Sequence, residues 1–275
     1  MLSCDAVAPK RRIVAPTSKS VTIKPVRPNE GIEAEYRRRL DALVSEMQAS
    51  LVYWLKAAYR ANEPHMAQDA SPARKLQAAF RKLARRWQAK FDTLAPELAQ
   101  WFATATKDRS DAGLRAALKK GGFTVEWKLT APMNDVMQAT IGQNVSLIKS
   151  IASEHLTDIE GIVMRSAAAG RDLGGLASEL EARYGVTKRR AALIARSQNN
   201  LATAELTRVR QKELGIQTAV WMHSSAGKHP RPSHVAANGK VYDIDKGMFL
   251  DGVWTIPGRE INCRCVSKVL IQGFT

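Results

Sequence analysis

The sequence predicts an α+β protein, with a mainly helical N-terminal and central region and a small loop-rich β module at the C-terminus. Up to residue 210, apolar residues recur at intervals of three and four, the period of an amphipathic helix. From Gly215 onward, short alternating runs are separated by turn residues, a pattern typical of strands. Charged residues make up 25% of the chain and hydrophobic residues 45%, which excludes a wholly disordered protein.

Three parts are expected along the chain. Residues 1–30 combine several prolines with scattered basic residues, and proline cannot propagate a helix, so they predict a basic, flexible arm. This arm would lie along a phosphate backbone or a neighbouring subunit, or make no contact at all. Residues 31–142 predict a helical domain. Residues 143–275 predict a second unit, with helices over 143–213 and the β module over 216–271.

The first helix is expected to begin near Gly31 and end at Glu63-Pro64, with Asn29 as its N-cap. Its apolar positions are Leu40, Leu43, Val44, Met47, Leu51, Leu55 and Ala58. The next is expected to begin at Ser71-Pro72, because proline is favoured in the first helical turn. Its apolar face consists of Leu76, Ala79, Phe80, Leu83, Trp87 and Phe91.

Separate helices follow at about 94–106, 110–120 and 133–143, and Gly121-Gly122 precedes a strand-like run at 123–127. Within 143–210, Gly170 and Gly174-Gly175 predict turns, and Gly185-Val186 is expected to join two helices over 173–184 and 187–211. In the module, strands are expected at 218–223, 240–244 and 265–271. Asn238-Gly239 predicts a type I′ turn.

The charge balance is strongly basic. Lys and Arg number 42 against 26 Asp and Glu, a net charge of +16 and a pI of about 10.0. This excess indicates a polyanionic partner, most commonly nucleic acid, or else a solvated basic surface.

One helix face concentrates this charge. From Ala70 to Phe91 the sequence has seven basic residues and no acid, and like charges one turn apart repel. A polyanion would relieve that repulsion, so this face predicts non-specific binding of double-stranded DNA; the alternative is a solvated face. The residues are Arg74, Lys75, Arg81, Lys82, Arg85, Arg86 and Lys90.

The cysteine content argues against a disulfide framework, because only Cys4, Cys263 and Cys265 are present. No secretory segment and no apolar run long enough to cross a bilayer is evident. We therefore expect a reducing compartment and no membrane association.

Possible metal ligands gather in the last third of the chain, at His223, His229, His234, Cys263 and Cys265. Thiolate and imidazole are the usual zinc ligands, so a zinc site at His234, Cys263 and Cys265 is one interpretation. The Cys-x-Cys spacing departs from the Cys-x-x-Cys knuckle, however. The alternative makes Cys263 a small core residue, with His234 bonded to a loop carbonyl and no cofactor.

A catalytic interpretation uses the same region. His234, Asn238 and a further histidine would imitate a His-Asn-His nuclease, in which one imidazole activates water and another holds a divalent ion. No Asp or Glu stands in the expected partnership with His234. A Cys–His nucleophilic pair lacks an evident base geometry as well. We therefore expect no enzymatic activity.

Several short motifs bear on the function of residues 145–271. They are Arg231-Pro232-Ser233-His234, Asn238-Gly239-Lys240-Val241-Tyr242, Pro257-Gly258 and Asn262-Cys263-Arg264-Cys265. With 191–199 and Leu214-Gly215-Ile216 upstream, this stretch resembles the phage Mu F-like head morphogenesis family. The matching positions are Arg196, Trp221, Arg231, His234, Gly239, Asn262, Cys263, Arg264 and Cys265. Two positions depart from the family pattern: Glu260 replaces a common proline and Gln198 a usual acid.

The resemblance implies a minor head (capsid) protein of tailed phages, which acts in DNA packaging or delivery. It would associate with the portal protein and other head proteins, at the portal vertex or capsid interior of the virion, after assembly in the host cytoplasm. Members of the family are generally not enzymes. Its DNA contacts would be non-specific and salt-sensitive. The competing hypotheses are a metal-dependent nucleic-acid enzyme built on His234 and a host-derived DNA-binding protein.

Overall fold

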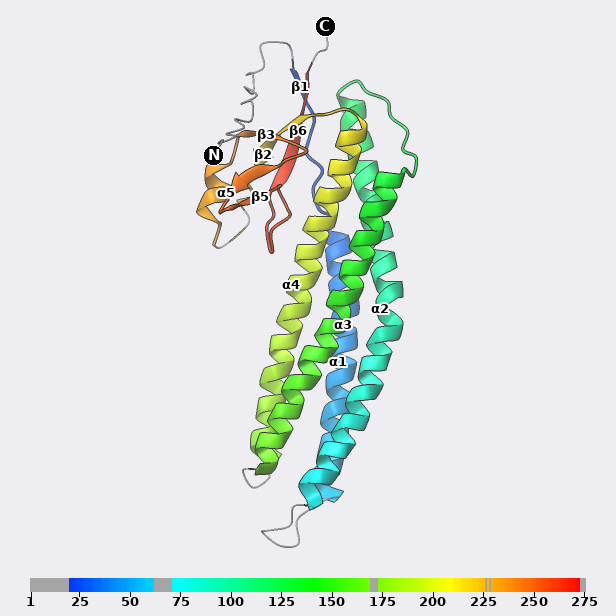
Figure 1. Cartoon of the computed structure of the whole chain (residues 1–275), viewed down its shortest axis with the longest axis vertical. Helices are drawn as coiled ribbons and strands as arrows, with labels where there is room; N and C mark the ends of the chain where they lie inside the picture. The colour runs from blue at the N-terminus through cyan, green and yellow to red at the C-terminus, as the bar shows by residue number, and fades with distance from the viewer. Residues whose placement is uncertain (1–19, 62–70, 169–172, 226, 228, 273–275) are drawn as a thin grey trace, which may run out of the picture.

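The structure, a computed structural model, describes residues 20–61, 71–168, 173–225, 227 and 229–272. Four long helices form an elongated bundle, with a β module beside one end of it (Figure 1). The helices are α1 (Glu30–Ala61), α2 (Ser71–Lys120), α3 (Ala131–Ala168) and α4 (Leu173–Glu213). The α+β class expected from the sequence is confirmed.

Successive helices run in opposite directions, as in an up-and-down bundle (Figure 1). α1 and α3 lead away from the β module, whereas α2 and α4 return toward it. The chain enters the β module directly from the C-terminal end of α4, so α4 belongs to the bundle and also supports the module.

The bundle core follows the periodicity that predicted the helices. Leu40, Val44 and Met47 of α1 are fully buried, as are Leu76 and Phe91 of α2. Burying an apolar side chain of this size stabilises the fold by about 1.5–3 kcal/mol. Packing of these faces therefore supplies most of the stability of the helices.

The start of α1 confirms the predicted cap. The side-chain Oδ1 of Asn29 accepts a hydrogen bond from the backbone N–H of Ile32 at 3.0 Å. Its carbonyl accepts another from the N–H of Glu33 at 3.1 Å. Two donors of the first turn are thus satisfied.

Several predicted helix breaks are wrong. α2 is one continuous helix over the stretch where separate helices at 71–91, 94–106 and 110–120 were expected, and it contains Pro96. Proline inside a helix costs about 3 kcal/mol, but Phe91, Leu98 and Phe102 bury on the same face and offset it. Similarly, α3 continues past residue 143, and Gly185 lies inside α4.

The parts expected along the chain are also distributed differently. The boundary expected between residues 142 and 143 falls inside α3, because all four helices share one hydrophobic core. The expected arm is in part a strand: β1 (Ser20–Thr22) pairs with β6 (Val266–Gln272). Ile23 is buried behind this pair, so burial holds the segment in place. The basic residues up to Lys19 lie outside the described residues.

The β module contains a four-stranded antiparallel sheet of order β1-β6-β2-β3, with β2 (Thr218–Met222) and β3 (Val241–Asp243). β4 (Met248–Leu250) and β5 (Val253–Thr255) form a separate hairpin, and α5 (Pro232–Ala236) is a short helix. The three strands predicted in the module are confirmed to within a few residues.

Two local predictions are wrong. Residues 123–127 form no strand, because they cover the end of α2, where the indole Nε1 of Trp127 donates to the carbonyl of Asp111 at 3.0 Å. Asn238-Gly239 is not a type I′ turn, because only Gly239 has a positive φ, of 81°. The turn follows α5, and Asn238 Oδ1 accepts a hydrogen bond from the backbone N–H of His223 at 2.9 Å.

The β module has a hydrophobic core of its own. Trp221 is fully buried there, with Tyr242 and Ile256, and Leu114 and Leu118 of α2 close it on the bundle side. Within the described ranges, no helix is long and apolar enough to cross a membrane.

Candidate metal site in the C-terminal module

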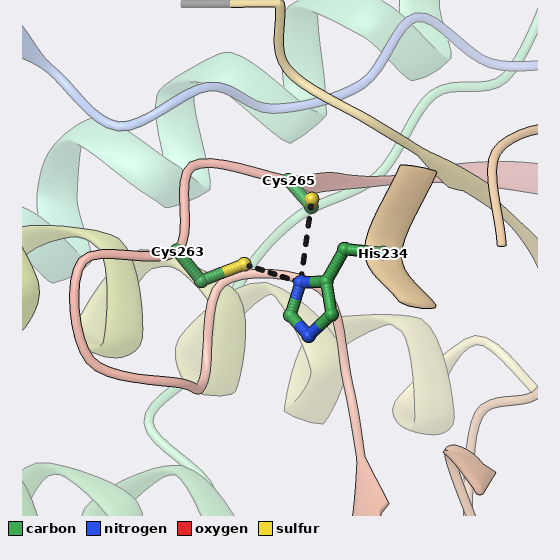
Figure 2. A group of neighbouring side chains, drawn as sticks. All are labelled: His234, Cys263 and Cys265. Atoms are coloured by element: carbon green, nitrogen blue, oxygen red, sulfur yellow. Dashed lines mark hydrogen bonds between the residues drawn. The ribbon is translucent and has the colours of Figure 1, made fainter. Parts of the chain in front are cut away.

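His234, Cys263 and Cys265 converge in the β module (Figure 2). The Nδ1 atom of His234 lies 3.4 Å from Cys263 Sγ and 3.8 Å from Cys265 Sγ. All three ligand atoms lie within 4.8 Å of one another. The residues are 3%, 3% and 5% exposed, so the cluster is buried. Tertiary folding therefore brings together the three residues named as candidate ligands from the sequence.

α5 holds His234 in place. Pro232 begins this short helix, and the hydroxyl of Ser233 donates to Asp251 Oδ2 at 2.6 Å. The ring of Trp221 meets the imidazole edge-on at 5.1 Å between centroids. The imidazole consequently presents Nδ1 to the two sulfur atoms, as Figure 2 shows.

The cysteine loop is anchored on α4. The backbone N–H of Asn262 donates to Ser197 Oγ at 3.0 Å, and Arg196 Nη1 donates to Asn262 Oδ1 at 3.2 Å. Asn200 Nδ2 donates to the carbonyl of Cys263 at 2.7 Å. Asn262 itself has a φ of 60°, which asparagine adopts more readily than most residues. These contacts explain why Arg196 and Asn262 belong to the motif set.

Gly258 lets the loop approach α4 closely. Its φ is 93°, and a Cβ atom there would lie 3.1 Å from Ala204 Cβ and 3.2 Å from the carbonyl oxygen of Asn200. Elsewhere in the motif, Gly239 donates its N–H to the carbonyl of Trp221 at 2.8 Å. Arg231 Nη2 donates to the carbonyl of Ile261 at 3.0 Å. Most of the motif residues thus shape or hold the loops around the cluster.

The two thiols interact strongly with each other. The pKa of Cys263 is lowered to about 5, chiefly because it accepts a hydrogen bond from the Cys265 thiol. The backbone N–H groups of Cys265 and Gly258 also donate to this sulfur and lower its pKa. The same hydrogen bond, with burial, raises the pKa of Cys265. The pair therefore favours one thiolate, which is the form that binds a metal ion.

A cavity of about 600 Å³ opens beside the cluster. Its lining includes His223, His229, Arg196, Arg231 and Arg264 together with the three clustered residues. Among the described residues that line it, none is a carboxylate. His223 and His229 do not join the group of mutually close ligand atoms. Two of the histidines singled out in the sequence therefore border the site without completing it.

The His-Asn-His nuclease geometry is not assembled. Asn238 directs its Oδ1 to the backbone of His223, and His234 faces two sulfur atoms. A Mg²⁺ or Mn²⁺ ion prefers carboxylate oxygens, and the part of the cavity wall that the structure describes offers none. The arrangement suits a soft ligand set.

The predicted DNA-binding residues lie on α2, in the half farther from the β module (Figure 1). Five of the seven are exposed and form no ion pair with a described residue: Arg74, Lys75, Lys82, Arg85 and Arg86. Arg81 Nε lies 3.4 Å from Glu160 Oε1 of α3, and Lys90 pairs with Glu46 of α1. Neighbouring helices thus supply some of the counter-charge that the α2 sequence lacks.

Buried polar groups in the bundle escaped the sequence analysis. His155 is fully buried, with Nδ1 2.8 Å from Thr187 Oγ1 and Nε2 3.2 Å from Gln48 Oε1. Gln198, noted as a departure from the family acid, accepts a hydrogen bond from Asn144 Nδ2 at 3.0 Å. The available signal was a polar residue at a core position of the helical period, such as His155 between Ala152 and Ile159.

Comparison with known proteins agrees with the motif resemblance. Residues 157–268 match the family of phage Mu protein F like proteins, so the predicted resemblance is confirmed over that stretch. The match includes the end of α3, all of α4 and the β module up to β6. It supports a phage head morphogenesis protein, a structural class rather than an enzyme class.

A relative extends the similarity beyond that segment. An uncharacterized protein of Haemophilus influenzae (strain ATCC 51907 / DSM 11121 / KW20 / Rd) is 27% identical over 255 residues. The alignment covers 91% of this chain and 56% of the relative, so the chain spans little more than half of that protein's length. No solved structure matches the chain.

Proposed function

We propose that this protein is a minor head protein of a tailed phage, acting in head morphogenesis and in DNA packaging or delivery. The observation that carries the proposal is the phage Mu F-like match over residues 157–268. The motif residues in that segment hold one packed unit together on α4, as the contacts of Arg196, Asn200 and Asn262 illustrate. The site of action is the virion, at the portal vertex or the capsid interior.

Non-specific binding of double-stranded DNA is part of the proposal. Five exposed basic residues of α2 without an ion-pair partner in the described chain support it, as does the net charge of +16. Contacts from Lys and Arg to phosphates release counterions and need no base sequence. These residues lie on the half of α2 away from the β module, which leaves the module accessible to a protein partner (Figure 1).

The partner would be the portal protein or another head protein, bound through the β4–β5 hairpin. Phe249 and Trp254 pack against each other at 5.6 Å between ring centroids, yet each is 57% exposed. Val253 beside them is exposed too. Aromatic side chains are enriched in protein interfaces, and exposed apolar clusters mark contact surfaces.

The direct test is the protein composition of purified phage particles. Proheads and mature heads from an induced host are separated by gradient centrifugation, and their proteins are identified by mass spectrometry. We expect this protein in both fractions, at fewer copies than the major capsid protein. Its absence from both fractions would overturn the proposal. Loss of the protein from the particles in a Phe249→Ser, Trp254→Ser double variant would identify the hairpin as its anchor.

The second candidate is a metal-dependent nucleic-acid enzyme, and the arginine-lined cavity beside His234 is the feature that favours it. Purified protein is incubated with plasmid DNA and Mg²⁺ or Mn²⁺. We expect the plasmid to remain intact. Cleavage that disappears in His234→Ala would replace the structural function by the enzymatic one.

A further inference from the structure

We propose that His234, Cys263 and Cys265 bind one Zn²⁺ ion, whose fourth coordination position faces the adjoining cavity and is taken by water. The site does not depend on a role in the phage head. The proposal rests on the geometry of the three ligand atoms, on their burial and on the donors around the sulfur atoms.

The spacing of the ligand atoms is that of a tetrahedral zinc site. Zn–S bonds of about 2.3 Å and Zn–N bonds of about 2.0–2.1 Å imply N···S separations of roughly 3.5 Å across a tetrahedral angle. The two separations from His234 Nδ1 are 3.4 and 3.8 Å, to Cys263 and Cys265 respectively. One ion placed among the three atoms would reach all of them with little movement.

The surroundings fit two metal-bound thiolates. Backbone N–H groups of Cys265 and Gly258 donate to the Cys263 sulfur, and that of Ser224 donates to the Cys265 sulfur. The indole Nε1 of Trp221 is buried and has no well-aligned hydrogen-bond partner among the described atoms. It lies close enough to Cys265 to favour a negative charge on that sulfur. These donors are the outer-shell partners that metal-bound sulfur requires.

The ligand set selects zinc over harder ions. Two thiolates and one imidazole are soft or intermediate ligands, whereas Mg²⁺ and Ca²⁺ need oxygen. Binding to the neutral cluster converts both thiols to thiolates, so that Zn²⁺ is taken up and two protons are released. A three-residue site with an open position differs from a closed four-residue structural site. The cavity provides the space for water at that position.

The ion would join parts of the chain that are distant in sequence. His234 belongs to α5, whereas Cys263 and Cys265 lie in the segment that leads into β6. A metal ion across these segments would fasten the cysteine loop to the rest of the module, whose core is small. We therefore expect zinc to raise the midpoint of thermal unfolding of the protein.

The test is metal analysis of the full chain, purified under reducing conditions after growth with zinc. Inductively coupled plasma mass spectrometry should find about one zinc per chain. His234→Gln, Cys263→Ser and Cys265→Ser should each lose most of it. Cys4→Ser and His223→Gln, which alter a histidine or cysteine outside the three-residue set, should keep it.

A second measurement needs no variant and so is independent of whether the variants fold. The wild-type protein is stripped with a chelator under reducing conditions and titrated with Co²⁺. Thiolate-to-cobalt charge transfer in the near ultraviolet and intense visible bands of four-coordinate Co²⁺ should appear and saturate at one equivalent, and Zn²⁺ should abolish them. Reduced wild-type protein that neither carries zinc nor binds Co²⁺ would overturn the proposal. So would zinc retained in all three ligand variants.

Discussion

Arg210 of α4 and Asp111 of α2 form a buried ion pair with two parallel hydrogen bonds. Nε donates to Oδ1 at 2.8 Å and Nη2 donates to Oδ2 at 2.9 Å, and the Arg210 side chain is 2% exposed. The guanidinium also donates to Glu213 at 2.8 Å and to the carbonyl of Lys128 at 2.9 Å. Four hydrogen bonds thus join α2, α4 and the loop between α2 and α3 at the end of the bundle that faces the β module.

Removal of Asp111 should destabilise the protein strongly. Asp111→Ala leaves the Arg210 charge buried beside fewer acceptors, and breaking a buried pair in this way costs about 3–5 kcal/mol. Urea unfolding followed by circular dichroism measures the change. The matched control is Asp108→Ala, because Asp108 is one turn away and mainly exposed. Its effect should stay within about 1 kcal/mol. Equal losses in the two variants would contradict the argument.

The stability of the bundle should decrease in mild acid because of His155. Burial, together with the charge of Arg183, lowers the pKa of His155 to about 4, against about 6.5 for an unfolded histidine. Between these values the unfolded chain binds a proton that the native imidazole does not. The unfolding free energy should therefore fall by roughly 3 kcal/mol as the pH drops from about 6.5 to about 4, with no further loss below.

The comparison of His155→Gln with wild type checks this pH dependence. Glutamine is not protonated, so the variant should lack this component of the slope between about pH 4 and 6.5. His229→Gln, which changes an exposed histidine, should retain it. A slope that is the same in all three proteins would rule out His155 as its source.

The basic surface of α2 should account for DNA binding. Replacing Lys82, Arg85 and Arg86 by alanine removes three exposed charges. The slope of log K against log salt concentration should become shallower by about 3. Fluorescence anisotropy with a labelled duplex measures it. The control replaces Arg115, Lys119 and Lys120, exposed basic residues at the other end of the same helix. If both triple variants weaken binding equally, the net charge and not the α2 surface is responsible.

Gly258→Ala should disturb the cysteine loop. The positive φ of 93° by itself costs an alanine about 1–2 kcal/mol. The new Cβ would also crowd Ala204 and the carbonyl of Asn200, which adds roughly 1–3 kcal/mol. Gly252→Ala separates the two effects, because Gly252 has a φ of 84° and no atom near the added Cβ. Thermal unfolding should show a clearly larger loss for Gly258→Ala than for Gly252→Ala.

Local pattern was enough for much of the helical architecture. The faces containing Leu40 and Val44, or Leu76 and Phe80, follow the helical period, and the same residues are buried in the bundle. The predicted breaks failed because they were judged from local propensity. Pro96 and Gly185 weaken an isolated helix, but the packing of α2 and α4 along the whole bundle outweighs these costs.

For the candidate site, residue types could be read from the sequence but neighbours could not. His234, Cys263 and Cys265 are chemically suited to bind a metal wherever they lie, and the Mu F-like motif is a property of the residue order. Their convergence, and the exclusion of His223 and His229, arise from contacts between α5, the cysteine loop and α4. The acids beside Arg81 and Lys90 come from other helices.

The sequence by itself determined the α+β class, the basic character and the family resemblance, because each depends on composition, period or motif order. Only the tertiary structure decided which polar groups are buried together. Arg210 with Asp111, and His234 with Cys263, are distant in sequence, and long-range packing of apolar faces brings them into contact.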